Sequence, residues 1–396
     1  MKKSSQLGFH LSRAAFVLSI AFVLPTTCFA RERGPRVEVV CPSPPITVTI
    51  GKNQALVYEL HVTNFDVVPL TLNHISIFAA RENPQPLTTI EGDKLSAAMT
   101  RVGVPMVMSS GSSPEAEDTR KLDPGGRNVV FLWIELPVNQ SVPASLRHQL
   151  VFSSTPAGAS KPSDATLDDF PVLVSQESAL VLSPPFNGGV WLAGDGPSND
   201  SNHRRSIFAI DGHIYSPERF AIDWVKVGPN GDSRHDGTTR NENWWGWGEP
   251  VLAVADGEIT EVVDEFPDNT PHVIPSVTLD NIAGNHIILQ IGQNRFVTYA
   301  HLQRGSIKVR ARDHVHQGDV LAFLGNSGNT SGAHLHLQVT DHNSVLQSQG
   351  VPFVFETFIY LGLGSDYPEK QVSEPWVNSI PSGNGVLKFE PMKKRR

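Results

Sequence analysis

Cysteine is almost absent from this sequence, with two residues in a chain of 396. One of them, Cys28, lies in an N-terminal stretch that we expect to be removed, so the mature chain keeps only Cys41. A single cysteine excludes an internal disulfide. Core packing therefore has to hold the fold together, unless Cys41 pairs with another molecule.

Long hydrophobic runs are equally scarce. The clearest run, Ala14–Leu24, follows three basic residues and is broken by Pro25. It is too short to span a bilayer, and small residues at positions 28 and 30 match a cleavage site. A lipoprotein is disfavoured because Pro25 stands where a branched apolar residue is expected. We expect a signal peptide over residues 1–30, no transmembrane segment, and a periplasmic or secreted mature protein.

Basic residues are fewer than acidic ones, with 32 Lys and Arg against 40 Asp and Glu. The formal net charge is −8, and the loss of the three basic residues in the signal peptide takes it to −11. An acidic exported protein is poorly suited to bind the phosphates of nucleic acid, so we expect no nucleic-acid partner. The basic end, 393–396, is predicted to be a solvated tail.

Helical periodicity is absent from Val37 to Ser178. Short alternating or nearly alternating segments, such as Ile46–Ile50 and Leu56–Val62, are separated by Pro and Gly clusters. This pattern predicts an antiparallel β-sandwich, Ig-like in general class, over residues 31–180. The segment 109–118 is predicted to be a mobile loop. Three isolated histidines on the expected strands are interpreted as ordinary strand residues: His61, His74 and His148.

The Pro/Gly-rich stretch 184–189 is predicted to be a linker into a second domain at 186–365, followed by a C-terminal tail at 366–396. Short strands continue through this second domain, so the predicted fold class is all-β. The loop Asn243–Gly248 contains three tryptophans. They could stack on a ligand, but we favour anchoring of the loop to the sheet.

Three histidines in the second domain stand on short apolar runs. His301 lies in Tyr-Ala-His-Leu, and His334 and His336 lie in Ala-His-Leu-His-Leu after a Gly-rich loop. Successive side chains of a strand point to opposite faces, so His334 and His336 share one face. A pair of half-exposed surface histidines would give the same spacing. Three histidines on two strands between Gly turns favour a metal or proton-transfer site.

The motifs around these histidines resemble the LytM/lysostaphin-type zinc metallopeptidases. Tyr-x-His-Leu at 299–302, the segment 315–320 and Gly-Asn-Ser-Gly-Asn-Thr-Ser-Gly-x-His-Leu-His at 325–336 occur in the family order. The strands Phe220–Asp223 and Pro250–Ile259 match two blocks upstream. The resemblance covers roughly residues 200–345 and implies a mostly antiparallel, partly rolled sheet with a groove across its centre.

The resemblance also implies roles. Asp223 and His336 match two zinc ligands, and His301 and His334 match the two non-ligand histidines. One of these would take a proton from the attacking water, and the other would stabilise the oxyanion. The implied cofactor is one Zn²⁺ per chain, and the implied partner is peptidoglycan or another peptide substrate.

One position departs from the family pattern. The first zinc ligand would stand four residues before Asp223, where this chain has Arg219. A guanidinium offers no lone pair and cannot bind a metal. On a strand, Arg219 would lie on the same face as Asp223. Two protein ligands are too few for a catalytic zinc site, so another residue supplies the third ligand or the site is empty.

His203 is the better candidate for the missing ligand. An Asp211–Gly212 turn would pair position 203 with position 220, and a bulge could turn His203 toward Asp223. His213 is a poor candidate, since an extended strand would place it roughly 33 Å from Asp223. Four further histidines are expected in solvated loops or turns: His235, His272, His314 and His316.

Two functions of different classes follow. The first is an exported zinc metalloendopeptidase that cuts peptide cross-links of the cell wall. The second is a degenerate, metal-free module that binds the wall or regulates a partner hydrolase, with an ion pair of Arg219 and Asp223 in place of the metal. Retention of Asp223 and the three histidines favours the enzyme. Paired histidines that accept phosphate in a sugar-transport domain are disfavoured by export.

Overall fold

The computed structural model describes residues 34–392, apart from 80–84, 104–117, 157, 236, 238, 274 and 382. The expected signal peptide at 1–30, most of the expected loop at 109–118 and the basic end at 393–396 lie outside the described residues. Residues 35–396 form one compact unit. Neither helix in the described part of the chain has the length and apolar character of a membrane span.

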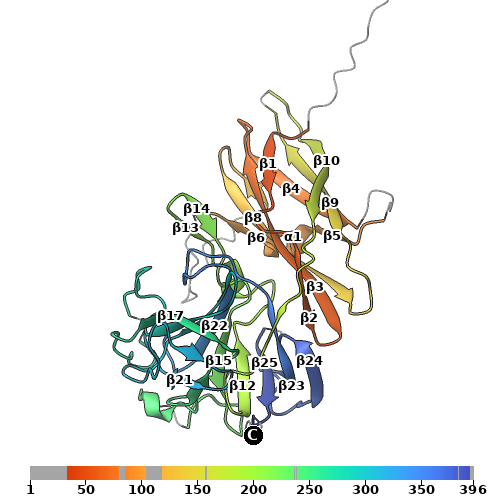
Figure 1. Ribbon diagram of the computed structural model, residues 1–396. Helices are drawn as coiled ribbons and strands as arrows, with labels where there is room; N and C mark the ends of the chain where they lie inside the picture. The colour runs from red at the N-terminus through yellow and green to blue at the C-terminus, as the bar shows by residue number, and fades with distance from the viewer. Residues whose placement is uncertain are drawn as a thin grey trace, which may run out of the picture. The chain divides into compact units, whose positions relative to one another are not determined.

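Two sheets of antiparallel strands occupy residues 37–173 (Figure 1). The first sheet contains β1 (Val37–Val40), β2 (Ile46–Ile50), β3 (Asn53–Asn64), β6 (Met99–Arg101) and β8 (Arg127–Pro137). The second contains β4 (Leu70–Phe78), β5 (Thr88–Glu91), β7 (Lys121–Leu122), β9 (Ser145–Ser154) and β10 (Ser163–Leu173), with helix α1 (Gly92–Ala97) after β5. Apolar side chains of both sheets share one core, as the prediction of a sandwich requires.

The central strand β3 is buried on both faces. Leu56 and Leu60 point into the core of the sandwich, whereas Ala55 and Val57 belong to a second core. That second core is formed mainly by residues beyond 180. Successive side chains of a strand point to opposite faces, so each face of β3 packs against a different layer, and both faces carry apolar side chains.

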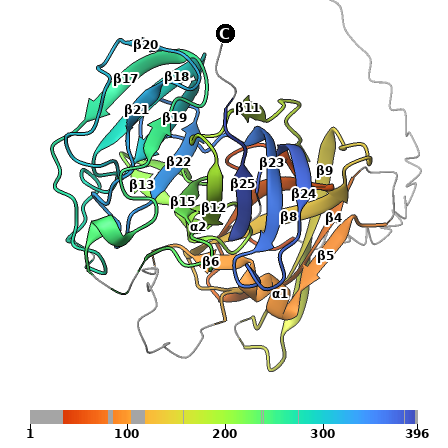
Figure 2. The same ribbon diagram turned by 90° about the horizontal axis from the view of Figure 1, so that it is seen from below.

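An eleven-stranded sheet dominates the rest of the chain. Ten strands follow the order β11 (Leu180–Leu182), β23 (Phe353–Leu363), β25 (Gly385–Phe389), β12 (Gly189–Gly194), β15 (Ile222–Lys226), β22 (Leu335–Thr340), β19 (Arg295–Ala300), β18 (His286–Gly292), β17 (Gly257–Val263) and β20 (His314–Val315), and β24 (Glu374–Ser379) pairs with β23. Figure 2 shows β19, β22, β15, β12 and β25 side by side. Except for the parallel pair β11–β23, the strand pairs are antiparallel, which confirms the all-β prediction.

Shorter elements surround this sheet. They are helix α2 (Asn202–Arg205), the hairpin of β13 (Phe208–Ile210) and β14 (His213–Tyr215), the 3₁₀ turn η1 (Asn241–Asn243), and the pair of β16 (Pro250–Leu252) and β21 (Val320–Phe323). The segment 366–396, expected to be a tail, instead contributes β24 and β25 to the large sheet. Val386, Leu387 and Phe389 are buried there, and this apolar run was the overlooked signal.

Candidate active site

The site is assembled on two neighbouring strands, β15 and β22. Their antiparallel register places Asp223 opposite His336. On the other side of β22, β19 pairs Ala300 with His336, so His301 follows directly at the end of β19. His334 precedes β22 by one residue. The strand pairing thus brings together four residues that the sequence singled out.

The Oδ1 atom of Asp223 lies at the centre of three imidazoles. It is 3.0 Å from Nδ1 of His336, 3.4 Å from Nε2 of His334 and 3.6 Å from Nε2 of His203. His301 completes the group, with its ring centroid 4.7 Å from that of His334. Five side chains from four separate segments, namely the Asp223 carboxylate and four imidazoles, therefore meet at one place.

His203 reaches the site by a route that the sequence did not reveal. The hairpin at Asp211–Gly212 exists, but its pairing ends at Phe208 and Tyr215. The expected pairing of position 203 with position 220 is therefore wrong, and His203 lies on α2. The side chain of Ser201 caps this helix by accepting a hydrogen bond from the backbone N–H of Arg204.

The tautomer of His203 suits metal binding. Its Nδ1 donates a hydrogen bond to the carbonyl oxygen of Asp195 at 3.0 Å. Nε2 therefore carries the lone pair in the neutral ring, and it faces Asp223.

Arg219 does not face the site, and the expected pair with Asp223 is wrong. The strand β15 begins at Ile222, so Arg219 lies in the preceding turn and alternation along the strand does not apply to it. Its guanidinium binds the carboxylate of Glu59, at 2.9 Å from each oxygen. Within the described residues no ion pair joins Arg219 to Asp223, which removes the proposed substitute for a metal.

A second layer of hydrogen bonds fixes the ring of His336. The side-chain amide of Gln338 donates to the carbonyl oxygen of Val345 at 2.8 Å, which orients its oxygen toward His336. Nε2 of His336 then donates to Oε1 of Gln338 at 2.9 Å. In the neutral ring this leaves Nδ1 of His336 as the nitrogen with a lone pair, and that atom faces Asp223. Sequence reasoning missed Gln338, although its position two residues after His336 places it on the same strand face.

His301 and His334 are held through backbone contacts. His301 adopts a left-handed backbone with φ 62°, and its Nδ1 donates to the carbonyl oxygen of Ser327 at 2.8 Å. Nδ1 of His334 donates to the carbonyl oxygen of Gly332 at 2.9 Å. Strained conformations of this kind persist where the surrounding structure enforces them, and they concentrate at functional sites.

Burial and mutual contacts shift the pKa values of these groups in opposite directions. Burial, reinforced by His334 and His336, holds the pKa of His301 well below its ordinary value. Burial also disfavours charge on His336, but its hydrogen bond to Asp223 and the carboxylate charge raise its pKa to about 9. For Asp223, burial acts to raise the pKa, and the neighbouring His334 and His203 outweigh it and lower the pKa overall.

The residues present fit a zinc ion. Ligand atoms of His203, Asp223 and His336 all lie within 4.8 Å of one another. Two imidazole nitrogens and one carboxylate oxygen form a donor set typical of catalytic zinc, in which a fourth position stays open for water or substrate.

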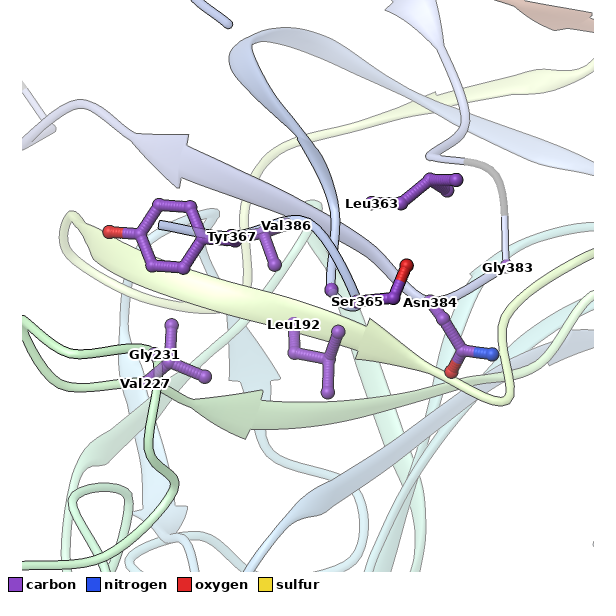
Figure 3. A pocket seen from close by; sticks show the side chains of 10 residues that line it. Leu192, Val227, Gly231, Leu363, Ser365, Tyr367, Gly383, Asn384 and Val386 are labelled. Atoms are coloured by element: carbon purple, nitrogen blue, oxygen red, sulfur yellow. The ribbon is translucent and has the colours of Figure 1, made fainter. Parts of the chain in front are cut away.

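A cavity of about 230 Å³ opens onto this cluster. Its lining includes His203, Glu218, Asp223, His301 and His336. A larger cavity of about 470 Å³ lies elsewhere, beside Leu192 of β12 and Val386 of β25 (Figure 3). Its described lining contains neither histidine nor carboxylate, so of the two cavities the smaller one offers the groups that could bind a metal or transfer a proton.

Other sequence expectations concern residues around the site. The hydroxyl of Tyr299 accepts a hydrogen bond from the backbone N–H of Val254 at 2.9 Å in the core, so this residue packs beside the site. The ring of Trp244 lies against Gly332, where it would collide with any added Cβ, and Trp247 packs on the core. These contacts agree with an anchoring role for this loop. Five histidines set aside in the sequence analysis are exposed: His213, His235, His272, His314 and His316.

Part of this chain is similar to known peptidases. The sequence profile of peptidase family M23 matches residues 235–348, which include His301, His334 and His336. The matched range begins after His203 and Asp223. Endolysin 2638A of Staphylococcus phage 2638A is 39% identical over 70 residues, which are 17% of this chain and 14% of that protein. An uncharacterized metalloprotease of Buchnera aphidicola subsp. Baizongia pistaciae is 29% identical over 104 residues, or 26% of this chain and 23% of the relative.

Solved structures with similarity include two catalytic domains. That of the antimicrobial peptidase lysostaphin from Staphylococcus simulans is 19% identical, with 41% of this chain and 88% of that chain covered and a TM-score of 0.22. That of the prophage-encoded M23 protein EnpA from Enterococcus faecalis is 17% identical, with 45% and 92% covered and a TM-score of 0.23. The match of residues 235–348 shows that this segment is similar to peptidase family M23, in agreement with the resemblance to the LytM/lysostaphin-type metallopeptidases.

Proposed function

We propose that this chain is an exported zinc metalloendopeptidase that cuts peptide cross-links of the bacterial cell wall. The observation that carries the proposal is the convergence of His203, Asp223 and His336, which supplies the third ligand that Arg219 cannot provide. The resemblance to LytM-type enzymes and the endolysin relative support the cell wall as the substrate class. Export rests on the signal peptide expected at residues 1–30.

In this proposal one Zn²⁺ is held by His203, Asp223 and His336. Zinc bound there supplies Lewis-acid chemistry, which makes water more acidic and polarises a scissile carbonyl. The chain's own residues perform the proton transfers. His301 and His334 each donate Nδ1–H to a backbone carbonyl, so Nε2 is the ring nitrogen that each has left for proton transfer. One takes the proton of the attacking water, and the other stabilises the oxyanion.

The rings are positioned before substrate arrives. Asp195 and Gln338 fix the tautomers of His203 and His336, and Ser327 and Gly332 fix those of the two catalytic histidines. Such fixed hydrogen-bond partners avoid reorganisation of the site during the reaction. A degenerate binding module is disfavoured, because Arg219 binds Glu59 and leaves Asp223 to the histidines.

The test uses the purified full chain. Elemental analysis should give close to one zinc per chain, and digestion of purified cell-wall sacculi should release peptides with new termini that mass spectrometry identifies. Chelation should abolish the release, and added zinc should restore it. A chain that takes up no zinc and releases no peptide, yet stimulates a separate wall hydrolase, would contradict the proposal and support the regulatory module.

A further inference from the structure

Glu59 is a charged residue in the middle of a buried strand face. It lies on β3 and is 0% exposed. Its neighbours Tyr58 and Leu60 point into the core of the sandwich. Glu59 belongs to the opposite face, together with Val57, which packs into the core of the large sheet. A carboxylate is retained in such a place only where partners compensate its lost hydration.

Two buried arginines provide that compensation. Arg219 binds both oxygens of Glu59 through Nε and Nη2, each at 2.9 Å. Arg204, which is 0% exposed, contacts the same carboxylate through Nη1. Its Nη2 also donates to the carbonyl oxygens of Tyr58 at 2.9 Å and Leu132 at 3.3 Å, on β3 and β8. Bidentate and charge-assisted bonds of this kind fix geometry as well as adding energy.

Both arginines lie close in sequence to residues of the candidate zinc site. Arg204 directly follows His203 on α2, which is only four residues long. A helix this short has no stability of its own and depends on tertiary contacts. Arg219 lies four residues before Asp223, in the turn that leads into β15. One carboxylate therefore ties two segments, distant from it in sequence, to the same strand of the sandwich.

We propose that Glu59 is a positioning residue for the zinc site, because it holds the segments of His203 and Asp223 in register through Arg204 and Arg219. The inference rests on the proposed function, since it assigns a role toward the zinc proposed there. The sandwich is then a structural part of the active site rather than an independent binding module. Arg219, which replaces the usual ligand, acts as the anchor of the Asp223 strand.

A positioning role differs from general support of the fold. Tyr58 offers a matched comparison, since it is the neighbouring residue on the same strand and is equally buried. Its hydroxyl binds Nε2 of His148 at 2.7 Å, on the side of β3 away from the zinc site. Tyr58→Phe should therefore destabilise the sandwich without changing the position of His203 or Asp223.

The experiment measures zinc affinity of the full chain by competition with a chromophoric chelator, well below the melting temperature of each variant. Glu59→Gln should raise the Kd for zinc at least tenfold, the scale seen when a residue that orients a metal ligand is lost. Cobalt-loaded Glu59→Gln should also show an altered visible absorption spectrum. Tyr58→Phe should lower the melting temperature and leave both the Kd and the cobalt spectrum unchanged.

Glu59→Gln leaves two buried guanidiniums without a carboxylate and could fail to fold. Arg219→Gln covers that case, because Glu59 keeps its pair with Arg204. It should raise the Kd in the same direction by a smaller factor. An unchanged Kd in every folded variant, or an equal rise in Tyr58→Phe, would overturn the positioning role. A wild-type chain that binds no zinc would instead contradict the proposed function itself.

Discussion

The sandwich and the large sheet each bury a histidine on a central strand, and the two histidines behave in opposite ways. His148 on β9 is 0% exposed, and burial lowers its pKa to about 4. His336 on β22 is 6% exposed, and its pKa is raised to about 9 because Asp223 outweighs the effect of burial. The hydrogen-bond partners of His148 are both uncharged, namely the hydroxyl of Tyr58 and the carbonyl oxygen of Phe170.

This comparison shows which feature makes a functional site of a buried histidine. Burial alone favours the neutral ring and produces a structural residue. A carboxylate within hydrogen-bond distance, joined by further imidazoles, produces a set of ligand atoms instead. His61 agrees with the first case, since burial lowers its pKa to about 4 as well.

The largest effect is expected when a histidine of the cluster around Asp223 is removed. His203→Ala and His336→Ala should each abolish stoichiometric zinc binding and peptidase activity, because two protein ligands hold zinc poorly. Elemental analysis and peptide release from sacculi measure both effects. The control is His213→Ala, which alters an exposed histidine of the nearby hairpin and should retain zinc and activity. Full zinc content in His203→Ala would show that this residue is no ligand.

Removal of the remaining two histidines should separate catalysis from metal binding. His301→Ala and His334→Ala should keep one zinc per chain while kcat/KM falls at least a hundredfold, the usual scale for loss of an acid–base or oxyanion group. Turnover of a cross-linked peptide and zinc content are measured on the same preparations. Zinc loss equal to that of His336→Ala would mean that ligands and catalytic residues have been confused.

Acid should weaken the sandwich through its neutral histidines. The pKa of His148 is about 4 in the folded chain and near 6.5 when unfolded, so the unfolded state takes up the proton first as pH falls. Its stabilising contribution is complete above pH 6.5 and is lost between pH 6.5 and 4. From pH 7 to pH 5 the free energy of opening should fall by about 2 kcal/mol for this group.

Hydrogen exchange of amides in β4 and β9 reports this opening locally, apart from any change at the zinc site. His148→Gln should be less stable at pH 7, because the hydrogen bonds of the ring are lost, and should depend less on pH. An equal pH dependence in the two proteins would show that His148 is not the group responsible.

The smallest effect is expected from Gln338, whose substitution tests whether it orients the ring of His336. Gln338→Leu removes the acceptor for Nε2–H of His336 and should weaken zinc binding about tenfold. Gln338→Glu keeps an acceptor at the same position and should retain the affinity. The chelator competition assay distinguishes the two variants, and equal zinc affinities for them would contradict an orienting role.

Most of the strands around the candidate site could be predicted from local sequence. Alternation placed His334 and His336 on one face, and the motif order around His301 indicated the family that the profile match identifies. Turn chemistry at Asp211–Gly212 correctly predicted a hairpin. These features depend on residues close together in the chain, where steric rules and strand periodicity act directly.

The sequence by itself indicated the all-β class and the three histidines of the motifs through local periodicity and spacing, and it indicated Asp223 through the resemblance to the LytM-type peptidases. Only the tertiary structure decided the partner of Arg219 and the route by which His203 reaches Asp223. Both depend on Glu59, which lies 145 residues before Arg204 and 160 before Arg219. The partners of a buried carboxylate are the charged groups that lie near it in the folded chain, and spacing along the sequence does not predict them.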